Sequence, residues 1–155
     1  MGNILTKLEW LASRCGFALL IFMSFVIGIQ VFMRYILNNS LMWPEELTRY
    51  CFLWCSMLGL VVTEQRGEHL RIDVLRTFSS PSVQKLLDIF ASIVTIAFYC
   101  FFIYLSTQMT FMVIDMEQYA ISFDLPMVYV WIAFPVLAFA ALLFSFVNIG
   151  KILKG

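Results

Sequence analysis

The stretch that decides the fold runs from Trp43 to Asp73 and reads WPEELTRYCFLWCSMLGLVVTEQRGEHLRID. Pro44 fits the first turn of a helix, where its missing N–H costs no hydrogen bond, and the two acids after it favour the positive end of the helix dipole. From Leu47 to Thr63 the residues are almost all apolar. At ~1.5 Å per residue, a helix over 44–65 spans roughly 30 Å, the thickness of the hydrocarbon part of a bilayer. The pattern therefore predicts a transmembrane helix with acids at one end and a polar, basic stretch at the other.

The composition of the whole chain indicates a membrane protein. Of its 155 residues, 62% are hydrophobic and 13% are charged, whereas soluble domains carry about 25% charged residues. Ten basic and ten acidic residues cancel, so no basic excess points to nucleic acid. The four cysteines lie in apolar segments without metal-ligand spacing. Cys51 and Cys55 would share a helix face, but small buried side chains explain them better than a metal site.

Apolar segments and amphipathic stretches alternate along the chain. The segments long enough to cross a bilayer lie at about 15–33, 44–65, 86–112 and 127–149. Residues 3–13 and 68–78 mix apolar and charged residues at helical spacing, which predicts two short amphipathic helices in the membrane interface. Pro135 predicts a kink in the last segment. The expected fold class is an all-α integral membrane protein, with four transmembrane helices in one domain over 1–155.

The basic residues predict the orientation. Lys7 and Arg14 precede the first segment, four basic residues lie between the second and third, and two follow the fourth. On the other side, Arg34 is the only basic residue, and the loop over 113–125 carries acids alone. Because cytoplasmic loops are enriched in Lys and Arg, both termini are expected on the cytoplasmic side.

One cation lies inside the second predicted span. The guanidinium of Arg49 is costly within a bilayer unless it finds a partner or reaches the interface. Glu45 and Glu46 precede it by four and three residues, which puts both acids on its face of the helix. Two interpretations stay open. The charges anchor the helix among themselves, or they are shared with another polypeptide or with lipid headgroups.

His69 is the only histidine of the chain. Its place just beyond the second segment suits a side chain at the membrane surface or a contact with the end of a partner's helix. A haem or metal role is poorly supported, because one histidine supplies one ligand.

The pattern also resembles a known family. The residues that carry the likeness are the motif Trp43-x-Glu-Glu-Leu, followed by Arg49, Trp54, Gly59, Gly67 and the run Glu-His-Leu-Arg-Ile-Asp. They resemble the small membrane subunit, the Q-type or DctQ-like component, of tripartite ATP-independent periplasmic (TRAP) transporters. The motif covers about a fifth of the chain, while the number and order of the apolar segments match over nearly all of it.

The resemblance implies a multi-pass subunit of a bacterial inner membrane, without catalysis or a cofactor of its own. It would scaffold a large M-type membrane subunit, which holds the substrate and sodium sites. A periplasmic substrate-binding protein would deliver an organic acid, such as a C4-dicarboxylate or a sialic acid. The candidate residues for contacts with these partners or with membrane lipid are, at the outer edge and in the span, Trp43, Glu45, Glu46, Arg49 and Trp54, and, at the cytoplasmic edge, His69, Arg71 and Asp73.

Two alternatives belong to other classes. An autonomous four-helix transporter acting as a homodimer needs a carboxylate near the middle of the bilayer. The acids in or beside the predicted spans all fall near span ends instead, at Glu45, Glu46, Glu64, Asp88, Asp115 and Glu117. A haem- or quinone-carrying subunit of a redox complex is the third class, and bis-histidine haem would need a second histidine.

Overall fold

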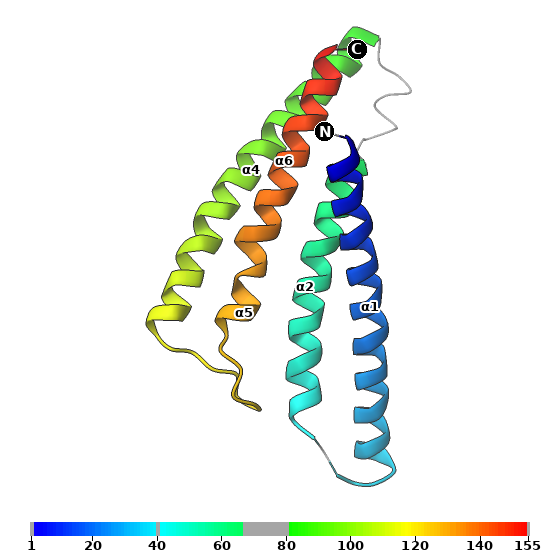
Figure 1. The fold of residues 1–155 in the computed structure, drawn as a ribbon, viewed down its shortest axis with the longest axis vertical. Helices are drawn as coiled ribbons and strands as arrows, with labels where there is room; N and C mark the ends of the chain where they lie inside the picture. Colours follow the sequence, from blue (N-terminus) through cyan, green and yellow to red (C-terminus); the bar gives the residue numbers. More distant parts are fainter. Residues whose placement is uncertain (1, 40, 67–80, 155) are drawn as a thin grey trace.

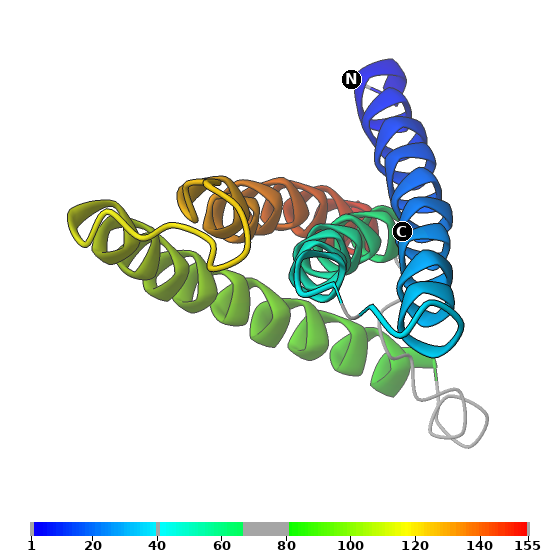
Figure 2. The same cartoon turned by 90° about the horizontal axis from the view of Figure 1, so that it is seen from below.

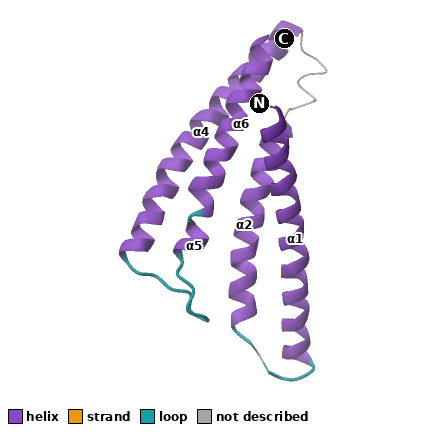
Figure 3. Cartoon of the chain, viewed as in Figure 1, coloured by secondary structure: helices purple, strands orange, loops and turns teal. Residues whose placement is uncertain are grey.

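The computed structural model describes residues 2–39, 41–66 and 81–154, and all its regular elements are helices. They are α1 (Gly2–Tyr35), α2 (Trp43–Arg66), α4 (Pro81–Asp115), α5 (Val128–Trp131) and α6 (Ala133–Lys154), as Figure 3 shows by colour. The interfacial helix predicted over 68–78 lies outside the described residues.

The helices form two antiparallel hairpins (Figure 1). One pairs α1 with α2, the other pairs α4 with α6, and α2 packs on α6 to join them. The two hairpins diverge towards the end that carries the α1–α2 and α4–α5 loops. Seen from below, α2 lies between α1 and the α4–α6 pair, and α1 lies at the edge (Figure 2). Both chain ends lie at the opposite end from these loops.

α1 is one continuous helix of 34 residues. The separate interfacial helix predicted over 3–13 is not present, because these residues form the first turns of α1 and run unbroken into the apolar segment. No proline or turn-forming pair ends the helix between the two parts. The amphipathic turns therefore extend the axis of the span.

Within the described part of the chain, three helical stretches are long and apolar enough to cross a membrane, namely Lys7–Tyr35, Val83–Asp115 and Val128–Gly150. In the first two, the most apolar part is only 11% and 6% buried within the chain. Helices that are apolar all round suit a lipid environment. α2 is long enough at 24 residues, but acids at both ends and an arginine in the second turn make it less apolar than the other three. Its crossing stays a prediction here.

The last apolar segment is interrupted one turn before Pro135. α5 ends at Trp131 and α6 begins at Ala133. Proline has no N–H to donate to the carbonyl four residues earlier, which is that of Trp131. The hydroxyl of Thr110 on α4 lies 3.4 Å from this carbonyl oxygen. The same hydroxyl also lies 2.8 Å from Ser106 O of its own helix, so its single proton is shared between the two carbonyl oxygens and only partly replaces the hydrogen bond that Pro135 removes.

A buried hydrophobic cluster lies where α2, α4 and α6 meet. Val61 of α2 and Tyr99 of α4 form a buried cluster with α6 side chains around Ala141. Ala133, Ala138 and Ala141 are all fully buried. Small side chains let helix backbones approach closely, which is the usual basis of helix association in membranes. α6 is therefore closely packed against both α2 and α4.

Candidate functional site

A carboxylate at the start of α2 holds the loop between α4 and α5. Oε1 and Oε2 of Glu46 accept hydrogen bonds from the backbone N–H groups of Ile121, at 2.9 Å, and Ser122, at 2.7 Å. The Tyr50 hydroxyl donates a further hydrogen bond to Glu46. The two side chains cooperate because residues four apart share one face of a helix. This contact ties residues more than seventy positions apart in the chain.

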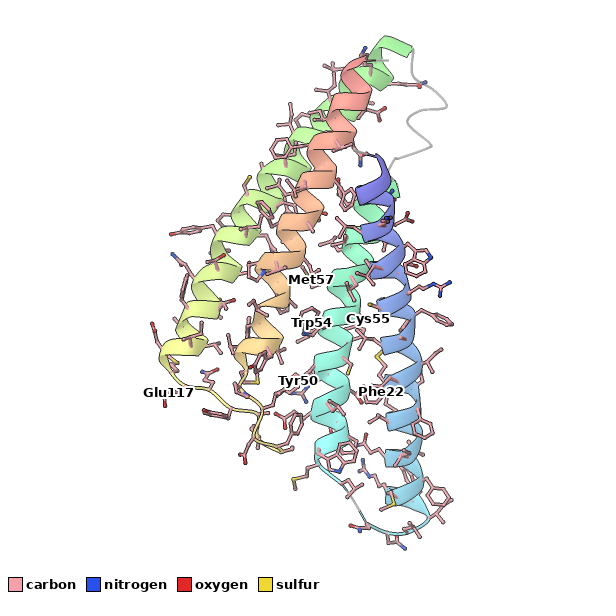
Figure 4. The ribbon with its side chains drawn as sticks, viewed as in Figure 1. Phe22, Tyr50, Trp54, Cys55, Met57 and Glu117 are labelled. Carbon is pink, nitrogen blue, oxygen red and sulfur yellow. The ribbon has the colours of Figure 1, made fainter. Side chains whose placement is uncertain are left out.

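The loop is shaped to present its N–H groups to Glu46. It folds back on itself through an isolated bridge between Tyr119 and Pro126, and the N–H of Ala120 donates to Leu125 O at 2.9 Å. The ring of Phe123 packs edge-on against Tyr50, with ring centroids 6.1 Å apart. The loop therefore contacts α2 through both polar and aromatic groups, and Figure 4 shows Tyr50 on the side of α2 that faces it.

Glu46 is ionised at physiological pH. It precedes the apolar part of α2, which begins at Leu47. The hydrogen bond from Tyr50 is the largest influence and, with those from Ile121 and Ser122, outweighs partial burial and lowers the pKa of Glu46 to about 2. Since the folded-state pKa lies below the usual 4.5, the contact stabilises the fold above that pH and weakens as the pH falls towards 2.

Trp54 makes a second contact between the hairpins, two turns further along α2. Its indole Nε1–H donates to the backbone oxygen of Tyr129 in α5, at 3.1 Å. Figure 4 labels Trp54 on the same side of α2 as Tyr50. The predicted site residues Glu46 and Trp54 are thus both used to join α2 to the segment after α4.

The other residues predicted near this end are exposed. Glu45 and Arg49 form an ion pair at 3.7 Å, with side chains 71% and 67% exposed. Exposed pairs contribute only about 0–1 kcal/mol, so this one orients the two side chains more than it stabilises the fold. Trp43 is 40% exposed at the first position of α2. The two neighbouring acids therefore have different partners, although the sequence placed both beside Arg49.

At the opposite end of α2, a second carboxylate is buried among three helices. Glu64 is 2% exposed. Its carboxylate accepts hydrogen bonds from the hydroxyl groups of Tyr99 in α4, at 3.1 Å, and of Ser145 in α6. The side-chain amide of Asn148 donates to the backbone oxygen of Glu64 at 2.6 Å. We call Glu64, Tyr99, Ser145 and Asn148 the inner polar cluster.

Sequence reasoning recorded Glu64 only as an acid near a span end and missed its burial. A signal was present, because Ser145 and Asn148 are the only polar residues between 133 and 149 and lie three apart, on one helix face. Polar residues on a single face of an apolar helix indicate a contact with polar groups of another helix.

The remaining predicted residues are His69, Arg71 and Asp73, which lie outside the described residues. Over the described ranges 2–39, 41–66 and 81–154, no group of three or more His, Cys, Asp and Glu side chains is arranged to hold a metal ion.

Comparisons with known proteins identify a family for the chain. Residues 14–155 match the family model of the DctQ component of tripartite ATP-independent periplasmic transporters. The chain is 29% identical over 97 residues to the sialic acid TRAP transporter permease protein SiaT of Haemophilus influenzae (strain 86-028NP), covering 63% of this chain and 15% of that protein.

Two further relatives are small permease proteins. A putative TRAP transporter small permease protein of Haemophilus influenzae (strain ATCC 51907 / DSM 11121 / KW20 / Rd) is 31% identical over 70 residues, 45% of this chain and 44% of that one. The C4-dicarboxylate TRAP transporter small permease protein DctQ of Vibrio cholerae serotype O1 is 29% identical over 76 residues, 49% of this chain and 33% of that one. The matched region thus spans less than half the length of each relative.

Proposed function

Because this chain belongs to the DctQ component family of TRAP transporters, we propose that it is the scaffold subunit of such a transporter, bracing a large M-type membrane subunit that carries the substrate. The proposal assigns different roles to this chain and to the large subunit, which family membership alone does not do. This chain would supply a fixed frame in the membrane, and the substrate and sodium sites would lie in the large subunit.

The observation that supports the proposal is that two carboxylates, Glu46 and Glu64, form hydrogen bonds with other elements of the same chain. Glu46 holds a loop through backbone N–H groups, and Glu64 accepts hydrogen bonds from two other helices. Carrier acids must exchange partners during transport, whereas these two connect elements of one fold. Carboxylates are energetically costly in a membrane protein, and here they hold helices and a loop together. This role fits a rigid support better than a moving carrier.

The proposed arrangement in the membrane has four crossings. α2 runs antiparallel to α1 and packs along it, so it would cross the bilayer together with α1. The surplus of basic residues at the end that carries both termini would place that end in the cytoplasm. The Glu46 contact and the exposed Glu45–Arg49 pair would then lie at the periplasmic edge of a bacterial inner membrane.

The substrate class rests on the names of the relatives. A sialic acid permease and a C4-dicarboxylate small permease are both among them, and both names describe organic acids. We therefore expect sodium-coupled uptake of an organic acid, delivered by a periplasmic binding protein, with this chain present in the membrane complex.

A pull-down with transport assays tests the proposal. The chain is tagged, expressed from its native genomic region together with whatever membrane and binding proteins that region encodes, and purified in mild detergent. A large multi-span protein should co-purify with the tagged chain. Proteoliposomes should take up an organic acid only when that large protein is included. Uptake by vesicles that contain this chain alone would contradict the proposal and favour the autonomous transporter.

A further inference from the structure

An exposed arginine near the start of α1 is stacked on an aromatic ring. The guanidinium carbon of Arg14 lies 4.3 Å from the centre of the Trp10 ring. The Trp10 side chain is 56% exposed. Stacking on an indole restricts the guanidinium without consuming its N–H donors. Arg14 therefore presents an oriented set of donors on the surface of the helix.

The pair lies on the face of α1 that points away from the rest of the chain. Ala12, Gly16 and Val26 are buried on the α2 side. At 3.6 residues per turn, Arg14 lies on the other side of the helix. The next side chains on its own face are Phe17, Ile21 and Phe25, which are 66%, 56% and 68% exposed.

This face of α1 therefore has a cationic and aromatic part near the N-terminus and an apolar part further along the helix. At the N-terminal end are a cation and a tryptophan, the residue types that gather at the level of lipid headgroups. Below them, an unbroken apolar surface continues into the span. An amphiphile with an anionic head and hydrocarbon tails matches both parts at once.

We propose that Trp10 and Arg14 form a binding site for the phosphate of an anionic phospholipid, whose acyl chains lie along Phe17, Ile21 and Phe25. The inference does not depend on the scaffold role. It needs only that Lys7–Tyr35 crosses a bilayer.

Neighbouring charges agree with an anionic ligand. Lys7, which is exposed two turns before Arg14, lies on nearly the same face and adds to the positive potential. Glu9 is five residues before Arg14, and its position on the helix is roughly 140° away. Side chains in helices lean towards the N-terminus, so the Arg14 guanidinium reaches up from the apolar part towards the headgroup level.

The first test compares lipid binding between matched variants. Arg14→Gln and Arg34→Gln remove the same charge from α1, but Arg34 lies twenty residues away on the opposite side of the helix. The full chain is purified in detergent with any partner that co-purifies, then titrated with phosphatidylglycerol or phosphatidylethanolamine and analysed by native mass spectrometry. Arg14→Gln should lower the apparent affinity for phosphatidylglycerol about fivefold, whereas Arg34→Gln should leave it unchanged. Equal affinity for the two lipids in the unmodified chain, or equal loss in both variants, would overturn the proposal.

The second test asks what covers the site in the membrane. Leu11 is 53% exposed and lies beside Arg14 on the same face. The photoreactive amino acid benzoylphenylalanine replaces Leu11, and the variant is expressed in its native cells, where any proteins that assemble with this chain are present. Cross-links to phospholipid are expected after illumination. Cross-links to a polypeptide instead would show that this face is a protein interface and would overturn the lipid assignment.

Discussion

At the scale of single residues, two adjacent acids provide a controlled comparison. Glu46 accepts two backbone N–H groups from the loop after α4, while Glu45 pairs with the exposed Arg49. In Glu46→Gln, only one side-chain oxygen remains to accept a hydrogen bond. The amide N–H₂ group then faces one of the two backbone N–H groups, so one of the two hydrogen bonds is lost. We expect the amides of Ile121 and Ser122 to exchange with deuterium several-fold faster in this variant. Glu45→Gln is the control, and faster exchange there to the same extent would show that the contact is not specific to Glu46.

The inner polar cluster gives the second prediction at this scale. Tyr99 is 1% exposed and donates to the buried carboxylate of Glu64. Tyr99→Phe keeps the ring and removes the donor, so the fold should lose about 1–3 kcal/mol of stability, the usual cost of an incompletely satisfied buried polar group. Thermal unfolding in detergent measures it. The matched control is Tyr104→Phe on the same helix, where the side chain is 59% exposed. Equal unfolding midpoints for Tyr99→Phe and the unmodified chain would contradict the assigned role.

The same residues show where sequence reasoning stops. The spacing of Glu45, Glu46 and Arg49 correctly indicates neighbours on one helix, but the partner of Glu46 lies in a loop 75 positions further along. Nothing in the local pattern tells which of two adjacent acids meets that loop. The burial of Glu64 likewise depends on hydroxyl groups from two other helices. Side-chain partners distant in sequence are set by the packing of the helices, which periodicity alone does not specify.

At the scale of elements, more of the structure is predictable. The acid-rich start and the apolar run predict a helix over 44–65, and α2 extends over Trp43–Arg66. The predicted third span, 86–112, lies inside α4 (Pro81–Asp115), whose first residue is a proline, as helix starts tolerate. The start of α1 differs, because amphipathic composition cannot distinguish a separate helix from the first turns of a longer one. Prolines thus mark the starts of two helices, while a change in composition without a break signal marks none.

The packing of α6 makes a prediction about an element. Ala141 is fully buried beside Val61 and Tyr99, so the helices approach closely there. Ala141→Leu would insert a larger side chain into this contact and should cost about 1–3 kcal/mol of stability, the range typical of overpacking. The unfolding midpoint and the yield of folded protein should both fall. Ala97→Leu is the matched control because Ala97 is exposed on α4. An equally stable Ala141→Leu variant would mean that the helices separate easily, which a rigid scaffold should not allow.

At the scale of the whole molecule, the Glu46 contact constrains how the chain crosses a membrane. The start of α2 and the loop over 116–127 must lie on the same side, because Glu46 binds that loop directly. If α1, α4 and α6 crossed a bilayer and α2 did not, the α1–α2 loop and this loop would lie on opposite sides. The contact and a three-crossing topology are therefore incompatible, and α2 is expected to be the fourth crossing.

Labelling of single cysteines tests this topology. In a background without the four native cysteines, Met42→Cys and Met116→Cys place a thiol in each of the two loops, at side chains that are 81% and 60% exposed. A membrane-impermeant maleimide added to cells with a permeable outer membrane should label both, because both loops should face the periplasm. Lys7→Cys, at the opposite end of α1, should be labelled only after the inner membrane is opened. Labelling of one loop position without the other would mean that α2 stays on one side of the membrane, and the Glu46 contact could then not form in the native protein.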